Sequence, residues 1–415
     1  MTSLTNPEKD RYNLTAPEVF ANPYPTYRRI LQQEPVYWND FLGGWYLMRY
    51  QDVAFAMQDK RISAKRPPIS KLSQLEQQNI FPLLESLSKW MLFCDPPEHT
   101  RLRTLFNKAF TPNIIASMAP GIHSLVNQLI DSIYERGNID IIHDLAYPIP
   151  AIVIAQMLGA NSEDYEQFKK WSSDLAKFFG LFRMNAEILA NAKKSIVEMK
   201  QYFHFILEER RCQPQDDLIS SLIFAQEKEN SLSDEEILSN CVFLTFAGHE
   251  TTTNLIANGL LALLANPSEM QKLKNDPSLI TTAVEEFLRY DSPVQRQARI
   301  AVTDLEINGQ QIRQGQRLFL AIGAANRDPE QFFNPDKLDI TRSQNPHLAF
   351  GKGTHFCLGA SLARLEAQIA INTIIQRLPN LRLDTAQIEW YENPSLRGMK
   401  SMPVAFNTES CTVSL

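Results

Sequence analysis

The spacing of hydrophobic positions changes along the chain and predicts a helix-rich protein with small sheets. Apolar residues first recur at helical spacing, then alternate with polar residues as in half-buried strands. In the alternating part, Asn308-Gly309 is typical of a tight hairpin turn. The pattern gives a helix-rich core at about 98–297 and 359–378 and small β-sheet regions at about 35–50, 298–321 and 380–406.

We therefore expect a fold that is mainly α with small β-sheets (α+β). The chain contains no internal repeat, low-complexity tract or Ser/Gly-rich linker, so we expect one domain over residues 1–415. Residues 61–93 begin as a predicted loop at Pro67-Pro68 and are then undefined. Residues 163–211 are long, amphipathic and rich in phenylalanine.

One predicted helix is nearly free of charge. Ser233 and Glu236 form a capping box, and the helix can continue to Ala265, before Asn266-Pro267. From Ile237 to Ala265 the only formally charged residue is Glu250. Such a helix is usually the central core of a large domain, where a lone carboxylate must be paired, hydrated or raised in pKa.

Composition narrows the class of protein. The chain has 415 residues, 44% of them hydrophobic, and a formal net charge of −6, so we expect a globular protein that does not bind nucleic acid. Its five cysteines are widely spaced and predict neither a disulfide framework nor a zinc ribbon. The N-terminus carries no signal-peptide core, and no apolar run fits a membrane anchor, so we expect a cytoplasmic protein.

The glycine-rich segment 350–360 carries the most informative cysteine, Cys357. A predicted helix follows at Ala360, and a helix N-terminus favours thiolate, which can bind a metal centre as a single strong donor. Two other interpretations remain open: a buried, inert cysteine, and a nucleophilic cysteine paired with a histidine. His355 lies only two residues away, which is weak evidence for a catalytic pair.

The spacing Phe350, Gly353, His355, Cys357, Gly359 resembles the haem-binding loop of the cytochromes P-450, F-x-x-G-x-[R/H]-x-C-x-G. The resemblance implies the family's fold, a triangular helical body around a buried haem b (iron protoporphyrin IX), with Cys357 as the metal ligand. Phe350 and Gly351 would lie beside the haem together with Gly359, and His355 would reach a propionate.

Four further constellations support the resemblance. The segment Ala247-Gly248-His249-Glu250-Thr251-Thr252 is similar to the family's oxygen-activating motif A-G-x-[D/E]-T-T, which implies catalytic roles for Thr251 and Glu250 and a haem contact for Ala247 and Gly248. Thr251 would hydrogen-bond bound oxygen and Glu250 would connect it to a proton supply. A Thr251 hydroxyl bond to the Ala247 carbonyl, together with Gly248, could open a notch in the helix. We assign no chemistry to His249.

The remaining constellations are built around basic residues. His99 and Arg103 resemble the family's propionate clamp, and Arg299 matches a third propionate ligand. Glu286 and Arg289, three apart on a helix, resemble the family's structural pair, although the spacing alone would equally suit a surface ion pair. The family's third basic partner is replaced here by Lys337, and Arg327 is a possible substitute.

The resemblance implies an oxidoreductase, a monooxygenase that uses dioxygen to oxidise a mainly apolar small organic substrate, as in secondary metabolism. Electrons would come from a separate ferredoxin with its NAD(P)H reductase, docking on a basic patch of Arg101, Arg103, Lys108 and Lys352. We expect a monomer. Two alternatives stay open: a peroxide-driven peroxygenase, and a non-enzymatic haem- or ligand-binding protein.

Overall fold

The computed structural model describes residues 11–65, 74–180, 185–229 and 232–408. Helices dominate, and the strands form small sheets, which confirms the expected fold class. The α-helices of the N-terminal half are α1 (Pro17–Ala21), α2 (Tyr24–Gln33), α3 (Tyr50–Ala56), α4 (Gln74–Lys89), α5 (Glu98–Phe106), α6 (Pro112–Ser117), α7 (Ala119–Ile133), α8 (Pro148–Met157), α9 (Tyr165–Gly180) and α10 (Ala186–Cys212). Those that follow are α11 (Leu218–Glu229), α12 (Asp234–Ala265), α13 (Pro267–Asn275), α14 (Ile280–Tyr290), α15 (Ile322–Ala325) and α16 (Ala360–Arg377).

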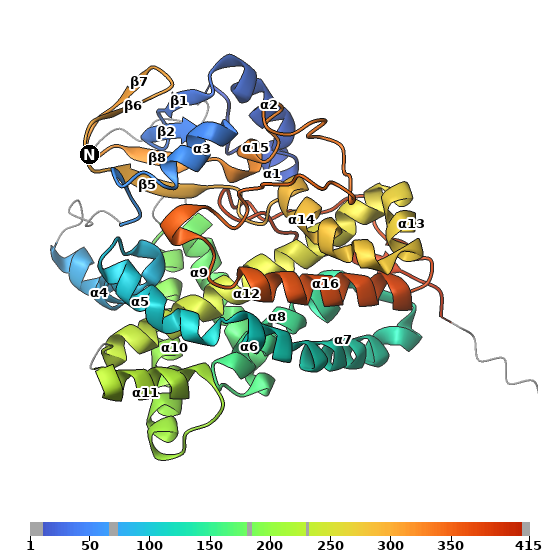
Figure 1. Ribbon diagram of the computed structural model, residues 1–415, viewed down its shortest axis with the longest axis horizontal. Helices are drawn as coiled ribbons and strands as arrows, with labels where there is room; N and C mark the ends of the chain where they lie inside the picture. Colours follow the sequence, from blue (N-terminus) through green and yellow to red (C-terminus); the bar gives the residue numbers. More distant parts are fainter. Residues whose placement is uncertain (1–10, 66–73, 181–184, 230–231, 409–415) are drawn as a thin grey trace, which may run out of the picture.

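The largest sheet has five strands in the order β1-β2-β8-β5-β3. Its strands are β1 (Val36–Asn39), β2 (Gly44–Leu47), β3 (Ile62–Ser63), β5 (Gln297–Ala301) and β8 (Arg317–Leu320). The pair β2–β8 is parallel, and the other pairs are antiparallel. This sheet and the helices α1, α2, α3 and α15 gather at one side of the molecule in Figure 1, above the body of longer helices.

Two smaller sheets complete the β structure. One joins β4 (Asn138–Asp140), β10 (Pro403–Ala405) and β9 (Arg382–Leu383), with β10 in the middle. The other is the hairpin of β6 (Leu305–Ile307) and β7 (Gln310–Ile312). Asn308 and Gly309, between them, both have positive φ, 49° and 75°. The predicted tight turn is confirmed, because both central residues of such a turn need positive φ.

The uncharged helix α12 runs through the centre of the helical body in Figure 1. The capping box of Ser233 and Glu236 is present at its start. Helices α8, α9, α10, α14 and α16 all pack against α12, so most of its side chains are buried. The predicted core helix is therefore confirmed, and it packs against α16, the helix that follows the cysteine loop.

The sequence pattern did not define two regions that the structure describes. Residues 74–89 form α4, a helix that we did not predict, while Pro67-Pro68 lie outside the described residues. The stretch 163–211 is two packed helices, α9 and α10, rather than one.

Candidate functional site

The cysteine loop precedes α16 and folds back on itself. The Cys357 N–H donates to the Phe350 carbonyl at 2.8 Å, and the Gly351 N–H donates to the Leu348 carbonyl at 2.8 Å. Gly351 has a φ of +73° and Gly353 one of +71°, which other residues rarely adopt. A Cβ on Gly353 would also lie 3.2 Å from the Met57 carbonyl oxygen. The glycines thus allow the tight path that brings Cys357 to the start of α16.

The thiol of Cys357 has a polar environment deep in the fold. Burial raises its pKa, while a hydrogen bond from the Gly359 N–H and the positive charges of Arg103 and Arg364 act in the opposite direction. The α16 N-terminus begins three residues later and also favours a thiolate. As a whole residue, Cys357 is partly accessible. This environment does not match an inert cysteine packed as a small hydrophobe.

Four basic side chains from three segments gather next to the loop. The rings of His99, on α5, and His355 lie 4.2 Å apart between centroids. Burial, together with repulsion from His99, Arg299 and Arg103, lowers the pKa of His355 to about 3. Burial also lowers the pKa of His99, helped by Arg103. Asp95 is the one acid that acts on both rings and raises their pKa.

The positive charge of this basic cluster meets little opposing negative charge, since Asp95 is the one acid among the described residues that acts on both rings. His99 is 1% exposed, yet its Nδ1 has no hydrogen-bond partner among the described residues. Arg103 donates to the Phe356 carbonyl at 2.6 Å, and Arg299 donates to the Ala298 carbonyl at 2.9 Å, so both guanidinium groups are held at the loop and at β5. Buried basic groups that repel one another, with an orphaned nitrogen between them, fit a site for an anionic group.

Helix α12 presents a half-accessible strip in the middle of its buried length. Ala247, Gly248, Glu250 and Thr251 are each partly accessible, whereas most other residues from Ile237 to Leu263 are buried. Because α12 is otherwise buried, partial accessibility in the middle of its length indicates an internal space beside this strip. The predicted motif lies on α12, which packs against α16, and the predicted cysteine lies in the loop before α16.

The threonine hydroxyls of this strip bond to the helix backbone. Thr251 Oγ1 donates to the Ala247 carbonyl at 2.8 Å, as expected from the sequence, and Thr252 Oγ1 donates to the Gly248 carbonyl at 3.0 Å. The helix continues through these residues without interruption, so the expected notch is absent. A Cβ on Gly248 would lie 3.2 Å from the Ile154 side chain, which shows that close packing against α8 also requires this glycine.

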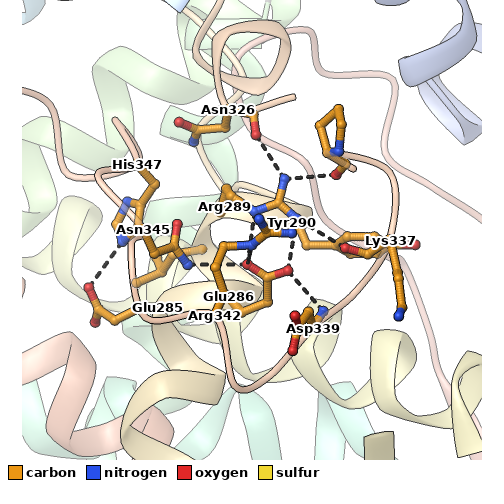
Figure 2. A network of polar contacts seen from close by, with 12 residues as sticks. Glu285, Glu286, Arg289, Tyr290, Asn326, Lys337, Asp339, Arg342, Asn345 and His347 are labelled. Atoms are coloured by element: carbon orange, nitrogen blue, oxygen red, sulfur yellow. Dashed lines mark hydrogen bonds and ion pairs between the residues drawn. The ribbon is translucent and has the colours of Figure 1, made fainter. Parts of the chain in front are cut away.

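Glu286 and Arg289 of α14 form a fully buried ion pair, not a surface pair. Arg289 donates twice to the Glu286 carboxylate, each time at 2.8 Å, and Figure 2 shows both bonds. The third cation is Arg342, whose Nε donates to Glu286 Oε2 at 3.0 Å. The Asp339 N–H and the Asn345 amide also donate to this carboxylate. Every lone pair of the buried carboxylate therefore faces a donor.

Both sequence candidates for the third cation were wrong. Lys337 contributes only its backbone carbonyl, which accepts from Arg289 at 3.3 Å, and its side chain is exposed. Arg327 instead bonds the Tyr290 carbonyl and pairs with Asp336. Arg342 has no motif of its own, because its position depends on how residues 338–345 fold back over α14. Only the presence of a basic residue a few positions after Lys337 could have suggested it.

Aromatic side chains gather on α12 just before the accessible strip, around Phe243 and Phe246. Trp90 is fully buried and contacts Phe93, Phe179, Phe243 and Phe246, with centroid distances between 5.2 and 6.2 Å. These residues come from the loop before α5, from α9 and from α12. The loop is tied to α12 by Asn240, which accepts from the Met91 N–H at 2.9 Å and donates to the Lys89 carbonyl at 2.9 Å. These rings form a fixed apolar wall against α12.

The structure also limits other kinds of site. In the part of the chain that it describes, no helix is long and apolar enough to cross a membrane. No group of three or more His, Cys, Asp or Glu side chains there could hold a metal ion.

Comparisons with known proteins agree with this geometry. The family model described as Cytochrome P450 matches residues 45–387. The biotin biosynthesis cytochrome P450 of Bacillus subtilis (strain 168) is 43% identical over 393 residues, which cover 94% of this chain and 97% of that protein. The polyketide biosynthesis cytochrome P450 PksS of the same strain is 38% identical over 409 residues, covering 96% and 100%.

A solved structure shows the same fold. The crystal structure of P450BioI in complex with hexadec-9Z-enoic acid ligated acyl carrier protein is similar with a TM-score of 0.89 and 41% sequence identity, covering 94% of this chain and 99% of that one. Sequence identity at this level, over nearly the whole of both chains, shows a common family and not only a common fold. The chain therefore belongs to the cytochrome P450 family and is an oxidoreductase, a haem- and iron-dependent monooxygenase.

Proposed function

We propose that this chain uses dioxygen to oxidise a mainly apolar small organic substrate, with haem b as its cofactor and electrons from a separate ferredoxin and its NAD(P)H reductase. The observation that supports the proposal is that Glu250 and Thr251 lie on α12, which packs against α16, while Cys357 lies in the loop directly before α16. The cofactor, when bound, supplies the oxidation chemistry, and the residues supply its ligand, its anchor and protons.

The residues fit a haem b. Cys357 offers one sulfur supported by the Gly359 N–H and by nearby positive charge. His99, Arg103, Arg299 and His355 would hold the two propionates, which would give the orphaned His99 Nδ1 a partner and relieve the repulsion within the cluster. Phe350, over which Arg364 lies at 4.5 Å, would shield the sulfur, and Gly351 and Gly359 would leave room beside it.

Thr251 and Glu250 would act on protons at the substrate side. The Thr251 hydroxyl is held toward the Ala247 carbonyl, so its oxygen can still accept a proton or a water hydrogen bond from the open side. Glu250 is partly accessible and can exchange protons with water in the internal space. Ala247 and Gly248 would let a flat cofactor approach the helix because they carry little or no side chain.

The aromatic wall supports an apolar substrate. The rings around Trp90 and Phe246 offer wide hydrophobic faces and no charge. The similar P450BioI was crystallised in complex with hexadec-9Z-enoic acid ligated acyl carrier protein, whose acid is a long hydrocarbon chain. We therefore propose that long-chain apolar compounds are the first substrates to screen, by the shift that a bound substrate causes in the haem absorption spectrum.

The experiment that tests the proposal combines spectra with coupling. The wild-type reduced carbon monoxide complex should show the thiolate-type band, and Cys357→Ser should lose it, while pyridine haemochrome spectra should identify haem b. Thr251→Ala should consume electrons and release peroxide without a matching amount of product. Thr252→Ala is the matched control, because its hydroxyl is buried and also bonds the backbone. Tight coupling in Thr251→Ala would contradict its role.

We also propose docking of the ferredoxin on the side of the cysteine loop, with the protein working as a monomer in the cytoplasm. Lys108 and Lys352 are exposed there, Arg101 contacts Glu236, and Arg103 is half-buried against the loop. The two exposed lysines are the positions for a charge-reversal test. Lys108→Glu with Lys352→Glu should slow ferredoxin-driven turnover and leave peroxide-driven turnover unchanged; equal rates with ferredoxin would exclude this surface.

A further inference from the structure

His249, to which the sequence assigned no chemistry, is fully buried in α12 beside Glu250. Its Nδ1 lies 3.0 Å from the Thr245 carbonyl oxygen. A carbonyl oxygen only accepts hydrogen bonds, so Nδ1 must carry a hydrogen. The first nitrogen of the ring is therefore committed to the helix backbone, and only Nε2 is available for other chemistry.

The second nitrogen faces the carboxylate of Glu250. Nε2 lies 3.5 Å from Glu250 Oε1, although adjacent residues of a helix ordinarily point apart. If the imidazole were neutral and the carboxylate ionised, two lone pairs would face each other in a buried place. One proton placed between the two atoms, on either of them, turns this repulsion into an attraction. The contact is therefore complete only when the pair holds one proton.

The surroundings offer His249 Nε2 no other partner in the described part of the chain. Tyr147, which precedes α8, packs against the ring edge-on with a centroid distance of 5.0 Å, and its own hydroxyl is buried without a hydrogen bond there. Burial raises the pKa of the Tyr147 and Tyr391 phenols, and the nearby Glu250 acts in the same direction. Beyond Tyr147 lie the charged groups of α9, with Lys169 over its ring at 4.8 Å.

We propose that His249 is a positioning residue that shares one proton with Glu250. The shared proton is then available at Glu250 for the oxygen chemistry at Thr251. The proposal deepens the proposed function and rests on it. Because Nδ1 is held by the Thr245 carbonyl, His249 does not pass a proton from one side of its ring to the other. The proton leaves the pair from Glu250 into the internal space, and a proton from water in that space restores it.

The proton balance of one delivery is simple. Glu250 releases the one shared proton to the Thr251 side, which leaves the Glu250 carboxylate and His249 Nε2 with no proton between them. A proton from water then restores the one-proton state, and no electrons are transferred in either step. Removing the imidazole removes the favourable one-proton state, and Glu250 should then lose its proton at a lower pH.

The test is an infrared titration of the haem-bound, carbon monoxide-bound ferrous protein, with the Glu250 signal assigned by its loss in Glu250→Gln. In His249→Phe the pH at which the site loses its proton should fall by roughly one unit or more. His249→Gln can still donate to Glu250 but cannot share a titratable proton, so it should keep the side chain in place and show the same fall. It also serves if the Phe variant does not fold.

Tyr147→Phe is the matched control, because it keeps the ring against His249 and removes only the hydroxyl. The midpoint pH of its infrared titration should equal that of the wild type. A fall as large as in His249→Phe would assign the shared proton to Tyr147 and overturn the proposal. An unchanged midpoint in both His249 variants would also overturn it. The carbon monoxide spectrum separates these results from a failure of the proposed function, because a missing thiolate-type band would appear before any titration.

Discussion

Arg342 illustrates how a single residue can complete a buried ionic network that its sequence context does not announce. Glu286 and Arg289 are both fully buried, so each needs several partners. Arg289 uses its remaining donors on the carbonyls of Asn326, Pro335 and Lys337, which ties α14 to the segment that leads to the cysteine loop. Arg342 adds charge and a directed N–H from the same segment.

Removing Arg342 should therefore destabilise the protein more than removing Lys337. Arg342→Ala leaves Glu286 with one cation instead of two, and breaking such a buried pair typically costs about 3–5 kcal/mol in the free energy of unfolding. Lys337→Ala removes an exposed side chain and should stay within about 0.5 kcal/mol of the wild type. Chemical denaturation of both variants measures the difference, and equal stabilities would show that Arg342 contributes no more than a surface charge.

Among the elements, α12 could be predicted in detail because local signals mark it: a capping box at its start, Asn266-Pro267 at its end and a single acid between. Helix α4 could not, since Pro82 lies inside it and its hydrophobic face is partial. The cysteine loop and the A-G-x-E-T-T segment were likewise local motifs. Their meeting across α12 and α16 follows from tertiary packing and was implied only by the family resemblance.

The crossing of α12, α14 and α16 depends on Gly259. A Cβ at this position would lie 2.9 Å from the Phe287 ring and 3.0 Å from Ile371 Cδ1. Gly259→Ala should therefore cost about 1–3 kcal/mol, as overpacking does. Gly121→Ala, in α7, meets nothing within 4 Å and should stabilise by up to about 1 kcal/mol through helix propensity. Thermal unfolding of the two variants should shift in opposite directions; a neutral Gly259→Ala would show that the crossing has room to adjust.

On the scale of the whole molecule, one buried acid should govern how stability varies with pH. Glu366 of α16 is 2% exposed, and burial raises its pKa from 4.5 to about 8. The folded state then binds this proton up to a higher pH than the unfolded state. Stability should fall as pH rises from about 4.5 to about 8, by at most about 1.4 kcal/mol per pH unit from this group.

Glu366→Gln removes the ionisable group and should flatten that part of the curve, with the largest gain in stability at the alkaline end. Glu389→Gln, at an exposed carboxylate, is the control and should follow the wild type. Denaturation midpoints measured from pH 5 to 8 give the comparison. A wild-type slope that survives in Glu366→Gln would assign the pH dependence to other groups.

The interleaved sheets have a consequence for biosynthesis. Strand β2 ends at residue 47, but its parallel neighbour β8 spans Arg317–Leu320. Strand β4, at Asn138–Asp140, pairs with β10 at Pro403–Ala405. A nascent chain leaving the ribosome would therefore carry β4 unpaired until nearly all of it has been translated, while β2 would pair only with β1 until β8 emerges. Such delayed closure exposes strand edges for many seconds, and exposed edges are where incompletely folded chains associate.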